Sequence, residues 1–291
     1  MVGGGSAGLV TSLIVAGAKA KVVLVEKHRM GGDCLYTGCV PSKSIIRSGR
    51  IMSYIRRAAD YGIVDAAGKV DFAAVMQRVQ GVIETIEPHD SPERFTSLGV
   101  TCVSGSARLI SPYEVEVDGK IITTESIVIA SGARPFVPHV PGLADIDYLT
   151  SDNVWSLTEL PPRLLVVGGG PIGCELAQAF SHLGSKVTQV DMAARIMPRE
   201  DEDVSAAVSA RFLEHGIDLL TGHKLLKFET VDGEHFMEAE HEGSTVRIAF
   251  DKVLLAIGRK ANTEDFGLEE IGVALTPQGT IEVNEFLQTS L

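Results

Sequence analysis

Two glycine-rich turns with the same internal spacing constrain this chain more than any other feature. Each is a Gly-x-Gly-x-x-Gly motif, and their glycines are Gly3, Gly5, Gly8, Gly168, Gly170 and Gly173. In each motif an acidic residue, Glu26 or Asp191, follows the first glycine by 23 positions and closes a hydrophobic stretch. A glycine turn between a strand and a helix presents backbone N–H groups to a pyrophosphate, and the acid accepts a hydrogen bond from a ribose hydroxyl. Both motifs are therefore typical of dinucleotide-binding βαβ units.

The two motifs belong to an internal repeat with an offset of 165 residues. Beyond the glycines, the repeat pairs Lys21 with Lys186 and Val25 with Val190. It predicts an α/β fold of two Rossmann-like dinucleotide-binding domains, each with a small β-meander. The predicted division of the chain is 1–150, 151–260 and 261–291. Two dinucleotide sites in one chain indicate electron transfer between a flavin and a nicotinamide.

The hydrophobic periodicity predicts the individual elements. Helices are expected at 8–18, 42–61, 72–86 and 204–215, and strands at 21–26, 101–104, 113–117, 120–124, 126–130, 164–167 and 252–257, with a strand meander at 228–250. Only Met1 and Val2 precede the first glycine, so the first strand is expected to be short or missing. A last segment begins at Ile281 and stops at Leu291, and we expect a chain truncated at both ends.

Composition and charge narrow the class of protein. The chain is 45% hydrophobic with a formal net charge of −12, which argues against nucleic acid and anionic membranes as partners. No apolar run reaches the roughly 18 residues that span a bilayer. Four cysteines are too few for a secreted disulfide scaffold. These features predict a cytoplasmic protein without membrane or nucleic-acid partners.

A Cys-x4-Cys pair follows the first glycine turn. Four residues separate Cys34 from Cys39, so the two sulfurs can meet across one loop or helical turn. Cys39 precedes the predicted helix at 42–61, where helix N-terminal amides and nearby Lys43 favour a thiolate. The alternatives are two buried thiols or half of a zinc site. Zinc needs about four ligands, and no second Cys or His pair stands at ligand spacing, so we expect no metal.

Other titratable residues carry weaker signals. Glu175 lies in the first turn of the helix that follows the second glycine motif, where it is either a helix-dipole carboxylate or a functional group. The eight histidines are scattered and form no pattern with a nucleophile or a metal partner. We interpret them as surface or structural residues.

Four segments of the chain resemble one known family. They are 31–43, which holds the cysteine pair, 129–135, 168–175 and 256–259. The chain is similar over essentially its whole length to the class I pyridine nucleotide-disulfide oxidoreductases. That family includes dihydrolipoamide dehydrogenase, glutathione reductase and mercuric reductase. The Val-Pro-Ser-Lys ending of the cysteine segment looks closer to mercuric reductase and dihydrolipoamide dehydrogenase than to glutathione reductase.

The resemblance implies a role for each site residue. Cys34 would be the thiol that exchanges with substrate, Cys39 the thiol against the flavin, and Lys43 would pair with Glu175. The first domain would bind FAD through Gly3, Gly5, Ser6, Gly8, Glu26, Lys27, Gly32, Asp33, Lys43, Gly105, Ala107, Ser131 and Gly132. The second would bind NAD(P)H through Gly168, Gly170, Pro171, Ile172, Gly173, Glu175, Asp191 and Gly258. Residues 261–291 would start the return to the FAD domain.

The resemblance also implies an activity. We expect an FAD-dependent NAD(P)H oxidoreductase that reduces a small-molecule disulfide or Hg(II), and a homodimer for the full-length protein. The family's C-terminal dimerisation domain, which brings a His–Glu base to the partner, is absent from these residues, so we expect them to be poorly active alone. The alternatives are a non-catalytic FAD/NAD-binding fragment and a flavin NADH oxidase that does not use the cysteines.

NADH is the expected nicotinamide cofactor. Asp191 would repel the 2′-phosphate of NADPH and bind the free 2′-hydroxyl of NADH. The positions that resemble the phosphate-binding arginines of NADPH-using relatives hold Met192 and Pro198. Arg195 and Arg199 lie close to these positions in sequence, and their positive charges favour the 2′-phosphate of NADPH instead.

Overall fold

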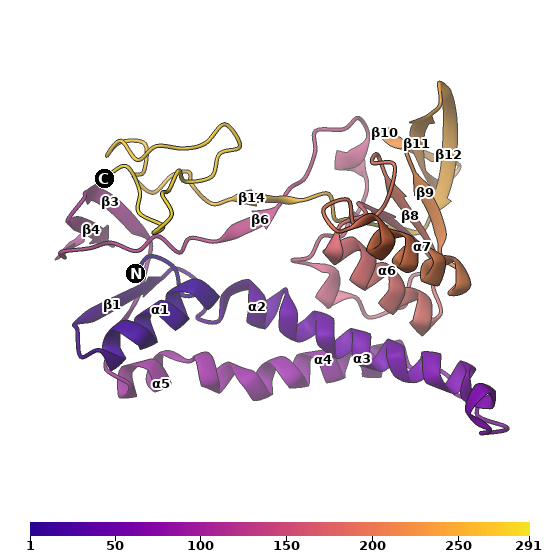
Figure 1. The fold of residues 1–291 in the computed structure, drawn as a ribbon, viewed down its shortest axis with the longest axis horizontal. Coiled ribbons are helices and arrows are strands. Elements are labelled where there is room, and N and C mark those ends of the chain that lie inside the picture. Colours follow the sequence, from indigo (N-terminus) through magenta and orange to yellow (C-terminus); the bar gives the residue numbers. More distant parts are fainter. The chain divides into compact units, whose positions relative to one another are not determined.

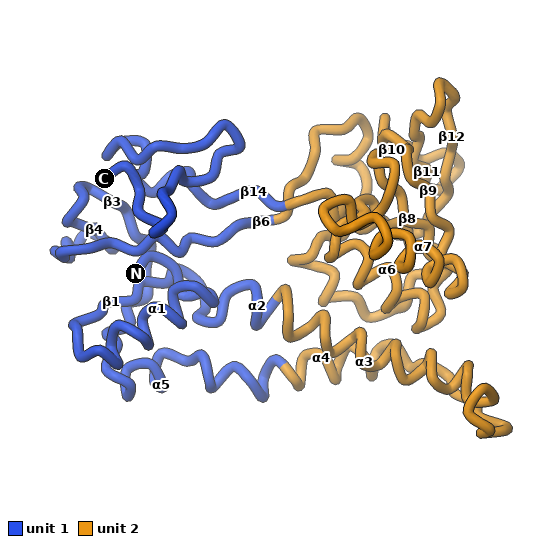
Figure 2. The backbone as a smooth tube through the Cα atoms, in the orientation of Figure 1, with its two compact units in different colours: residues 1–36, 83–134, 259–291 blue, residues 37–82, 135–258 orange.

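The computed structural model describes residues 1–291 and divides them into two compact units (Figure 2). Unit 1 comprises residues 1–36, 83–134 and 259–291, and unit 2 comprises residues 37–82 and 135–258. The chain therefore passes between the units four times. The predicted division at residues 150 and 260 is defined by cofactor binding rather than by spatial contacts, and it stays a prediction.

Unit 2 is built on a four-stranded parallel sheet in the order β13-β7-β8-β9. Strands β8 and β9 of this sheet are labelled in Figure 1. The strands are β7 (Arg163–Val167), β8 (Lys186–Asp191), β9 (Asp218–Thr221) and β13 (Lys252–Leu255), and the helices between them are α6 (Pro171–Leu183) and α7 (Glu202–Glu214). From Leu164 to Val167 the chain is buried without alternation, as expected for a parallel strand covered on both faces. The glycine turn lies between β7 and α6, at the carboxyl edge of this sheet.

Unit 1 repeats this strand order with a much shorter first strand. β1 (Val22–Glu26) pairs in parallel with β2 (Val100–Ser104), and Val2 forms parallel bridges to Val25 and Ile129. Val2 thus takes the place of β7, and Ile129 takes the place of β13. The short first strand was predicted, whereas the strand predicted at 126–130 is only this single bridge. Helix α1 (Ser6–Gly17) follows the turn and begins earlier than expected.

Each unit also carries a three-stranded antiparallel meander. The strands are β3 (Ala107–Ser111), β4 (Glu114–Val117) and β5 (Lys120–Thr123) in unit 1, and β10 (Lys224–Val231), β11 (Glu234–His241) and β12 (Ser244–Phe250) in unit 2. The predicted α/β class with two Rossmann-like domains and their meanders is confirmed. The sequence analysis missed β3, whose Leu109 is buried although Arg108 and Ile110 beside it are exposed. Two short strands, β6 (Ala133–Pro135) and β14 (Arg259–Ala261), pair with each other.

The segment with the cysteines is helical. The helices from here to β2 are α2 (Gly32–Tyr36), α3 (Cys39–Arg56), α4 (Phe72–Ile86) and α5 (Pro92–Ser97). Short 3-10 turns lie at Ala58–Tyr61, Glu87–Asp90, Leu143–Asp145 and Val154–Ser156. Helix α3 begins at Cys39 rather than at Ser42, because Pro41 falls in the first turn, where no intrahelical N–H bond is required. The prediction of α4 is confirmed at both ends.

Each unit has its own hydrophobic core. In unit 2, residues of β7, β8 and β13 pack with the meander, where the rings of Phe228 and Phe250 meet edge to face at 5.9 Å. In unit 1, one cluster joins Val2 and Val25 to the meander residues Leu109 and Val115. A second cluster packs α1 and α5 on the other side of β1 and β2. Burial of these apolar side chains is the main stabilising contribution.

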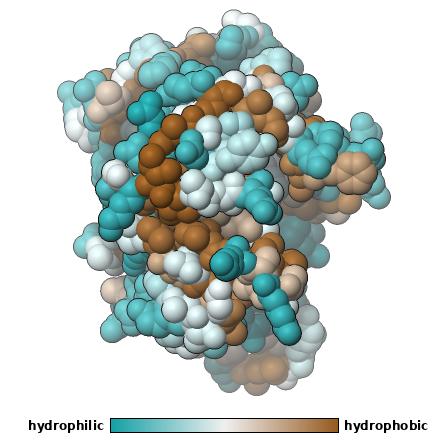
Figure 3. All heavy atoms as spheres, turned by 90° about the vertical axis from the view of Figure 1, so that its left-hand side faces the viewer, coloured by the Kyte–Doolittle hydropathy of each residue, from teal (hydrophilic) through white to brown (hydrophobic).

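The surface of unit 1 is partly apolar. Its exposed large hydrophobic side chains are Val10, Ile14, Leu98, Ile110, Tyr113, Ile121, Val283, Phe286, Leu287 and Leu291. Figure 3 shows hydrophobic atoms gathered in a continuous band on one face of the molecule. Apolar areas of this kind are typical of surfaces that contact another protein or domain. Among all the helices of the structure, none combines the length and the apolar character that crossing a bilayer requires.

Two histidines of unit 2 form a close pair between α6 and the end of α7. His182 Nε2 lies 3.2 Å from His215 Nδ1, and the two rings meet edge to face at 4.5 Å. Burial, and then the positive field of His215 and three arginines, lowers the pKa of His182 to about 4. Burial also lowers the pKa of His215. The interpretation of the histidines as surface or structural residues stays a prediction.

The histidine pair is expected to make unit 2 less stable in mild acid. A histidine in the unfolded chain has a pKa near 6.5, so below that pH the unfolded state binds a proton that folded His182 rejects. The contribution of neutral His182 to the free energy of unfolding is complete above pH 6.5 and is lost as the pH falls toward 4. After a discount for solvent screening we expect a loss on the order of 1–2 kcal/mol.

Urea unfolding between pH 7.5 and 4.5 measures this loss. His182→Gln should flatten the pH dependence, because glutamine takes up no proton. His139→Gln, at an exposed histidine of the same unit, is the matched control and should keep the wild-type dependence. An unchanged slope in His182→Gln would contradict the assignment.

Candidate functional site

The first glycine turn of unit 1 admits only glycine at its two tightest positions. Gly3 has φ of +108°, and a Cβ there would lie 2.2 Å from the Ala130 carbonyl oxygen. A Cβ on Gly8 would lie 1.9 Å from the Gly3 carbonyl oxygen. Both close approaches are to backbone, which cannot move aside. The turn therefore brings the first N–H groups of α1 to the surface with no side chain above them.

Glu26 ties the carboxyl end of β1 to this turn. Its Oε2 accepts a hydrogen bond from the Gly4 N–H at 2.6 Å, and its Oε1 accepts one from the His28 N–H at 2.8 Å. A carboxylate offers about four acceptor positions, so two remain for a ligand hydroxyl. The predicted ribose-binding role of Glu26 thus fits its geometry.

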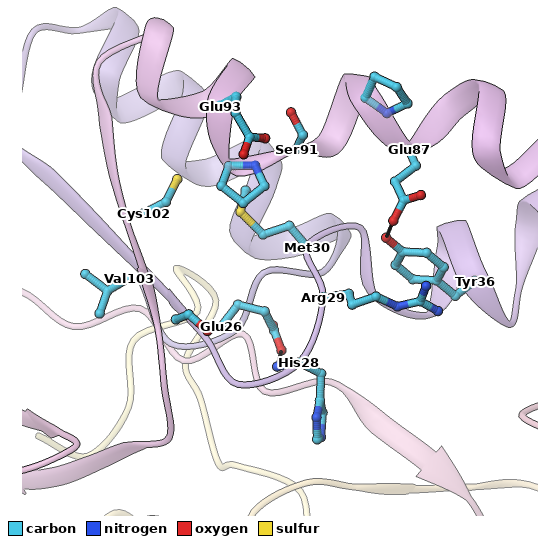
Figure 4. A pocket seen from close by; sticks show the side chains of 13 residues that line it. Glu26, His28, Arg29, Met30, Tyr36, Glu87, Ser91, Glu93, Cys102 and Val103 are labelled. Atoms are coloured by element: carbon cyan, nitrogen blue, oxygen red, sulfur yellow. Dashed lines mark hydrogen bonds between the residues drawn. The ribbon is translucent and has the colours of Figure 1, made fainter.

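A cavity of about 590 Å³ opens beside Glu26 (Figure 4). It is lined by Glu26, His28, Arg29, Met30, Tyr36, Glu87, Pro88, Ser91, Pro92, Glu93, Cys102, Val103 and Ser104. Its size lies in the range of small-molecule sites, and most of the surface facing it is apolar although charged residues such as Glu26, Arg29 and Glu87 are among its lining residues. Of these lining residues, the sequence analysis named only Glu26. The register of the sheet pairs Glu26 with Ser104, so the carboxyl-edge rule for parallel sheets could have found Ser104.

Tyr36 closes one side of this cavity. Its hydroxyl donates to Glu87 Oε1 at 2.7 Å, and the Arg29 guanidinium lies 3.7 Å from the centre of its ring. Burial and the hydrogen bond to Glu87 raise the pKa of Tyr36 to about 12, which keeps the phenol protonated as a donor. Tyr36 is therefore anchored in unit 1. The next residue, Thr37, is anchored in unit 2, where its carbonyl accepts from Trp155 Nε1 at 3.1 Å.

The other predicted FAD residues of unit 1 lie around the same turn and at its neighbouring strand ends. Gly32 packs against Gly5, because a Cβ on Gly32 would lie 2.6 Å from the Gly5 Cα. The Ser131 hydroxyl donates to the Asn262 carbonyl at 2.7 Å. Ser6 begins α1, Lys27 follows Glu26, and Ala107 begins β3. Asp33 forms an ion pair with Arg259. The Gly105 N–H donates to the Glu26 carbonyl, and the Gly132 carbonyl accepts from the Asn262 N–H. Their contact with FAD stays a prediction.

The second glycine turn, in unit 2, has the same geometry as the first. Gly168 has φ of +120°, and a Cβ there would lie 2.3 Å from the Ala256 carbonyl oxygen. A Cβ on Gly173 would lie 2.2 Å from the Gly168 carbonyl oxygen, whereas a Cβ on Gly170 would meet no atom within 4 Å. Gly170 therefore faces open space. Pro171 and Ile172 begin α6 at this point, and Gly258 follows β13 at the same sheet edge.

Asp191 repeats the part played by Glu26. One carboxylate oxygen accepts from the Gly169 N–H, and the other accepts from the Ala193 N–H at 2.6 Å. The nearby Arg195 guanidinium is engaged within its own loop, where it donates to the carbonyls of Glu200 at 2.9 Å and Pro198 at 3.2 Å. Arg195 therefore has hydrogen-bond partners within its own loop.

Lys43 and Glu175 form an ion pair within unit 2. The Lys43 ammonium donates to both Glu175 carboxylate oxygens, at 2.7 and 2.9 Å. Helices α3 and α6 cross closely because Gly49 on α3 leaves room for the Ala179 backbone on α6. Both partners are exposed, so the pair contributes at most about 1 kcal/mol to stability. The pairing that the family resemblance implied is present.

The two cysteines lie on successive helices. Cys34 is half-buried on α2, and Cys39 is exposed at the first residue of α3. Lys43 follows Cys39 by one helical turn, so both side chains share a face of α3. Cys39 thus lies at the N-terminal end of α3, one helical turn before Lys43. The redox pairing of Cys34 with Cys39 stays a prediction.

The residues of each unit fit one dinucleotide. In both units a glycine cradle that a Cβ would fill lies beside a carboxylate with spare acceptor positions. Unit 1 adds a cavity next to its carboxylate. These are the features that an adenosine diphosphate group requires, namely backbone N–H groups for the phosphates and an acid for the ribose.

Comparisons with known proteins agree with this geometry. A family model described as pyridine nucleotide-disulphide oxidoreductase matches residues 1–291. The mercuric reductase of Staphylococcus aureus is 34% identical over 290 residues, which cover 100% of this chain and 53% of that protein. The dihydrolipoyl dehydrogenase of Bacillus subtilis (strain 168) is 33% identical over 308 residues, which cover 99% of this chain and 64% of that protein.

A solved structure shows the same fold. The HOCl-induced flavoprotein disulfide reductase RclA from Escherichia coli superimposes with a TM-score of 0.85 at 27% identity, over 99% of this chain and 62% of that one. The chain spans about half the length of the mercuric reductases that it matches. The match to the family model covers every residue, including both glycine turns and the cysteine segment. The chain therefore belongs to the pyridine nucleotide-disulphide oxidoreductase family.

Proposed function

We propose that this protein is an FAD-dependent oxidoreductase that passes electrons from NADH through the Cys34–Cys39 disulfide to a small disulfide or to Hg(II). The observation that carries the proposal is the duplicated turn, in which Glu26 and Asp191 each hold the backbone of a glycine cradle. Family membership supports FAD as the cofactor of unit 1. The Lys43–Glu175 ion pair, one helical turn from Cys39, supports the redox role of the cysteines.

The chain's residues would divide the binding work between two cofactors. Gly5 and the N-terminus of α1 would hold the FAD pyrophosphate, and Glu26 its ribose. Gly170 and the N-terminus of α6 would hold the NADH pyrophosphate, and Asp191 its ribose. When bound, FAD supplies the relay of two electrons from nicotinamide to disulfide. Lys43, held by Glu175, would present its positive charge on the face of α3 that carries Cys39.

The thiol chemistry proceeds in three steps. The Cys34–Cys39 disulfide takes up two electrons and two protons and becomes two thiols. The Cys34 thiolate then attacks one sulfur of the substrate disulfide, which releases the first product thiol and leaves a mixed disulfide. The Cys39 thiolate attacks Cys34 in that mixed disulfide, releases the second thiol and restores the starting disulfide. In the case of Hg(II), the same two electrons would reduce the ion to the metal.

Counting thiols tests this proposal directly. We expect anaerobic addition of NADH to the flavin-loaded protein to create two additional titratable thiols per chain, measured after denaturation and compared with protein that received no NADH. A non-catalytic nucleotide-binding chain would bind NADH with no gain of thiols. A flavin NADH oxidase would consume NADH in air with no gain of thiols. Either of these outcomes would overturn the proposal.

NADH is expected to bind more tightly than NADPH. Asp191 would lie against the 2′ position, where its charge accepts from a hydroxyl and repels a phosphate, and Arg195 is engaged by its own loop. Direct titration of the protein's fluorescence gives both dissociation constants, and we expect a difference of about 10-fold or more, or at least 1.4 kcal/mol. Asp191→Asn should reduce the difference between the dissociation constants of NADH and NADPH. Arg199→Ala should leave it unchanged, and tighter NADPH binding by the wild type would contradict the assignment.

Three further expectations rest on the family resemblance. We expect the full-length protein to be a homodimer, to lie in the cytoplasm, and to turn over faster than these 291 residues alone. The last expectation follows because the family's acid–base pair comes from the partner's C-terminal domain. Loss of such help typically slows a reaction by about 10²–10⁴-fold.

A further inference from the structure

A buried glutamine lies beneath the second glycine turn. Gln189, on β8, has none of its surface exposed, and its Nε2 donates to the Gly168 carbonyl at 2.8 Å. The same Nε2 lies 3.5 Å from the sulfur of Cys174 on α6, and that thiol donates to the Gly169 carbonyl at 3.4 Å. Two side chains from inside the domain therefore hold the carbonyls of two consecutive glycines.

The first half of the chain has a turn of the same geometry without this polar pair. The offset of 165 residues places Leu24 at the position of Gln189 and Leu9 at the position of Cys174. Both leucines are buried and support a turn of the same geometry in unit 1. The glutamine also leaves its Oε1 buried without a hydrogen-bond partner, which destabilises the folded state. Because glutamine at position 189 is unfavourable for stability, its presence there needs an explanation other than folding.

The reason lies in the peptide between Gly168 and Gly169. Glycine on both sides lets this peptide rotate at little cost. In the observed orientation the Gly169 N–H donates to Asp191, and the Gly168 carbonyl points inward to Gln189. A rotated peptide would break both hydrogen bonds and would turn the carbonyl oxygen toward the place of a negatively charged pyrophosphate. Gln189 stabilises only the first orientation.

We propose that Gln189 is a positioning residue, which holds the Gly168–Gly169 peptide in the orientation that binds a nicotinamide dinucleotide. This inference rests on the proposed function. FAD would remain bound through turnover and would itself hold the turn of unit 1. NADH would leave in every cycle, so the turn of unit 2 must keep its shape without a ligand. Preorganisation of this kind reduces the entropic cost of each binding event.

Gln189→Met tests the proposal, since methionine keeps the length of the side chain and removes the amide. We expect the dissociation constant for NADH to rise about 3- to 10-fold, which corresponds to the loss of one hydrogen bond. Hydrogen exchange at the Gly169 amide should accelerate, while the Leu165 amide in β7 keeps its protection. The midpoint of urea unfolding should stay the same or rise, because the unpartnered Oε1 is removed.

Gln178→Met is the matched control, because Gln178 lies on α6 and contacts His215 at the end of α7 rather than the glycine turn. It should change neither NADH binding nor exchange at Gly169. A folded Gln189→Met with unchanged NADH affinity would overturn the proposal. If the wild type binds no NADH, the proposed function fails, and unchanged exchange at Gly169 in Gln189→Met would then overturn this inference separately. Gln189→Leu, which copies the residue at position 24, serves in the same way if Gln189→Met does not fold.

Discussion

Cys39→Ser is expected to abolish the gain of thiols on NADH addition and to slow the single-turnover reduction of a small disulfide on the order of 10³-fold or more. Serine cannot form the disulfide that stores the two electrons, and its hydroxyl cannot resolve a mixed disulfide at Cys34. Cys39 is exposed at the first residue of α3, so the substitution leaves the packing of unit 2 unchanged. The rate is measured by stopped-flow mixing of reduced, flavin-loaded protein with the disulfide.

An acceptor that needs no thiol is the control for this variant. Ferricyanide takes electrons without forming a disulfide, so NADH-dependent ferricyanide reduction should be the same in Cys39→Ser and in the wild type. This result would show that cofactor binding is intact in the variant. If Cys39→Ser still reduced the disulfide at the wild-type rate, the cysteine pair would not be the redox centre, and the reading as a flavin NADH oxidase would replace the proposed function.

Gly173→Ala and Gly170→Ala are expected to separate folding from binding in unit 2. A Cβ on Gly173 meets the Gly168 carbonyl oxygen at 2.2 Å, and this backbone clash should destabilise the unit by about 3 kcal/mol or more. Gly170 has ordinary dihedral angles at the start of α6, and a Cβ there meets nothing within 4 Å. Alanine at position 170 restricts the unfolded chain but is a poorer N-cap than glycine, so we expect the free energy of unfolding to change by less than about 1 kcal/mol.

Although Gly170→Ala should change stability little, it should weaken NADH binding. Its methyl group would occupy the space through which a pyrophosphate approaches the backbone, so we expect NADH affinity to fall at least ~10-fold. Urea unfolding gives the stability of both variants, and fluorescence titration gives the affinity. Gly17→Ala, where a Cβ also meets nothing within 4 Å, controls for alanine in a helix away from the turns. Full NADH affinity in Gly170→Ala would show that the second turn binds no pyrophosphate.

The sequence was sufficient to predict those features that depend on residues near one another along the chain. The glycine turns were predictable because Gly8 touches the backbone of Gly3, and the acid that closes the next strand returns to the same turn. The helix at Phe72–Ile86 was predicted at both ends because its apolar spacing follows the helical period over its whole length. The Lys43–Glu175 pair was expected only through the family resemblance, because 132 residues separate its members.

Tertiary structure decided the features that depend on distant partners. A stretch at 126–130 has the composition of a strand, yet Ile129 alone pairs, through a single parallel bridge to Val2. The cavity beside Glu26 draws its walls from several segments, and one of its contacts, between Tyr36 and Glu87, spans 51 residues. The amide of Gln189 reaches the Gly168 carbonyl only because β8 lies beside β7 in the sheet. Short-range sterics and helical periodicity can be read from a single chain, whereas strand pairing, cavity walls and buried hydrogen bonds require the partners that folding brings together.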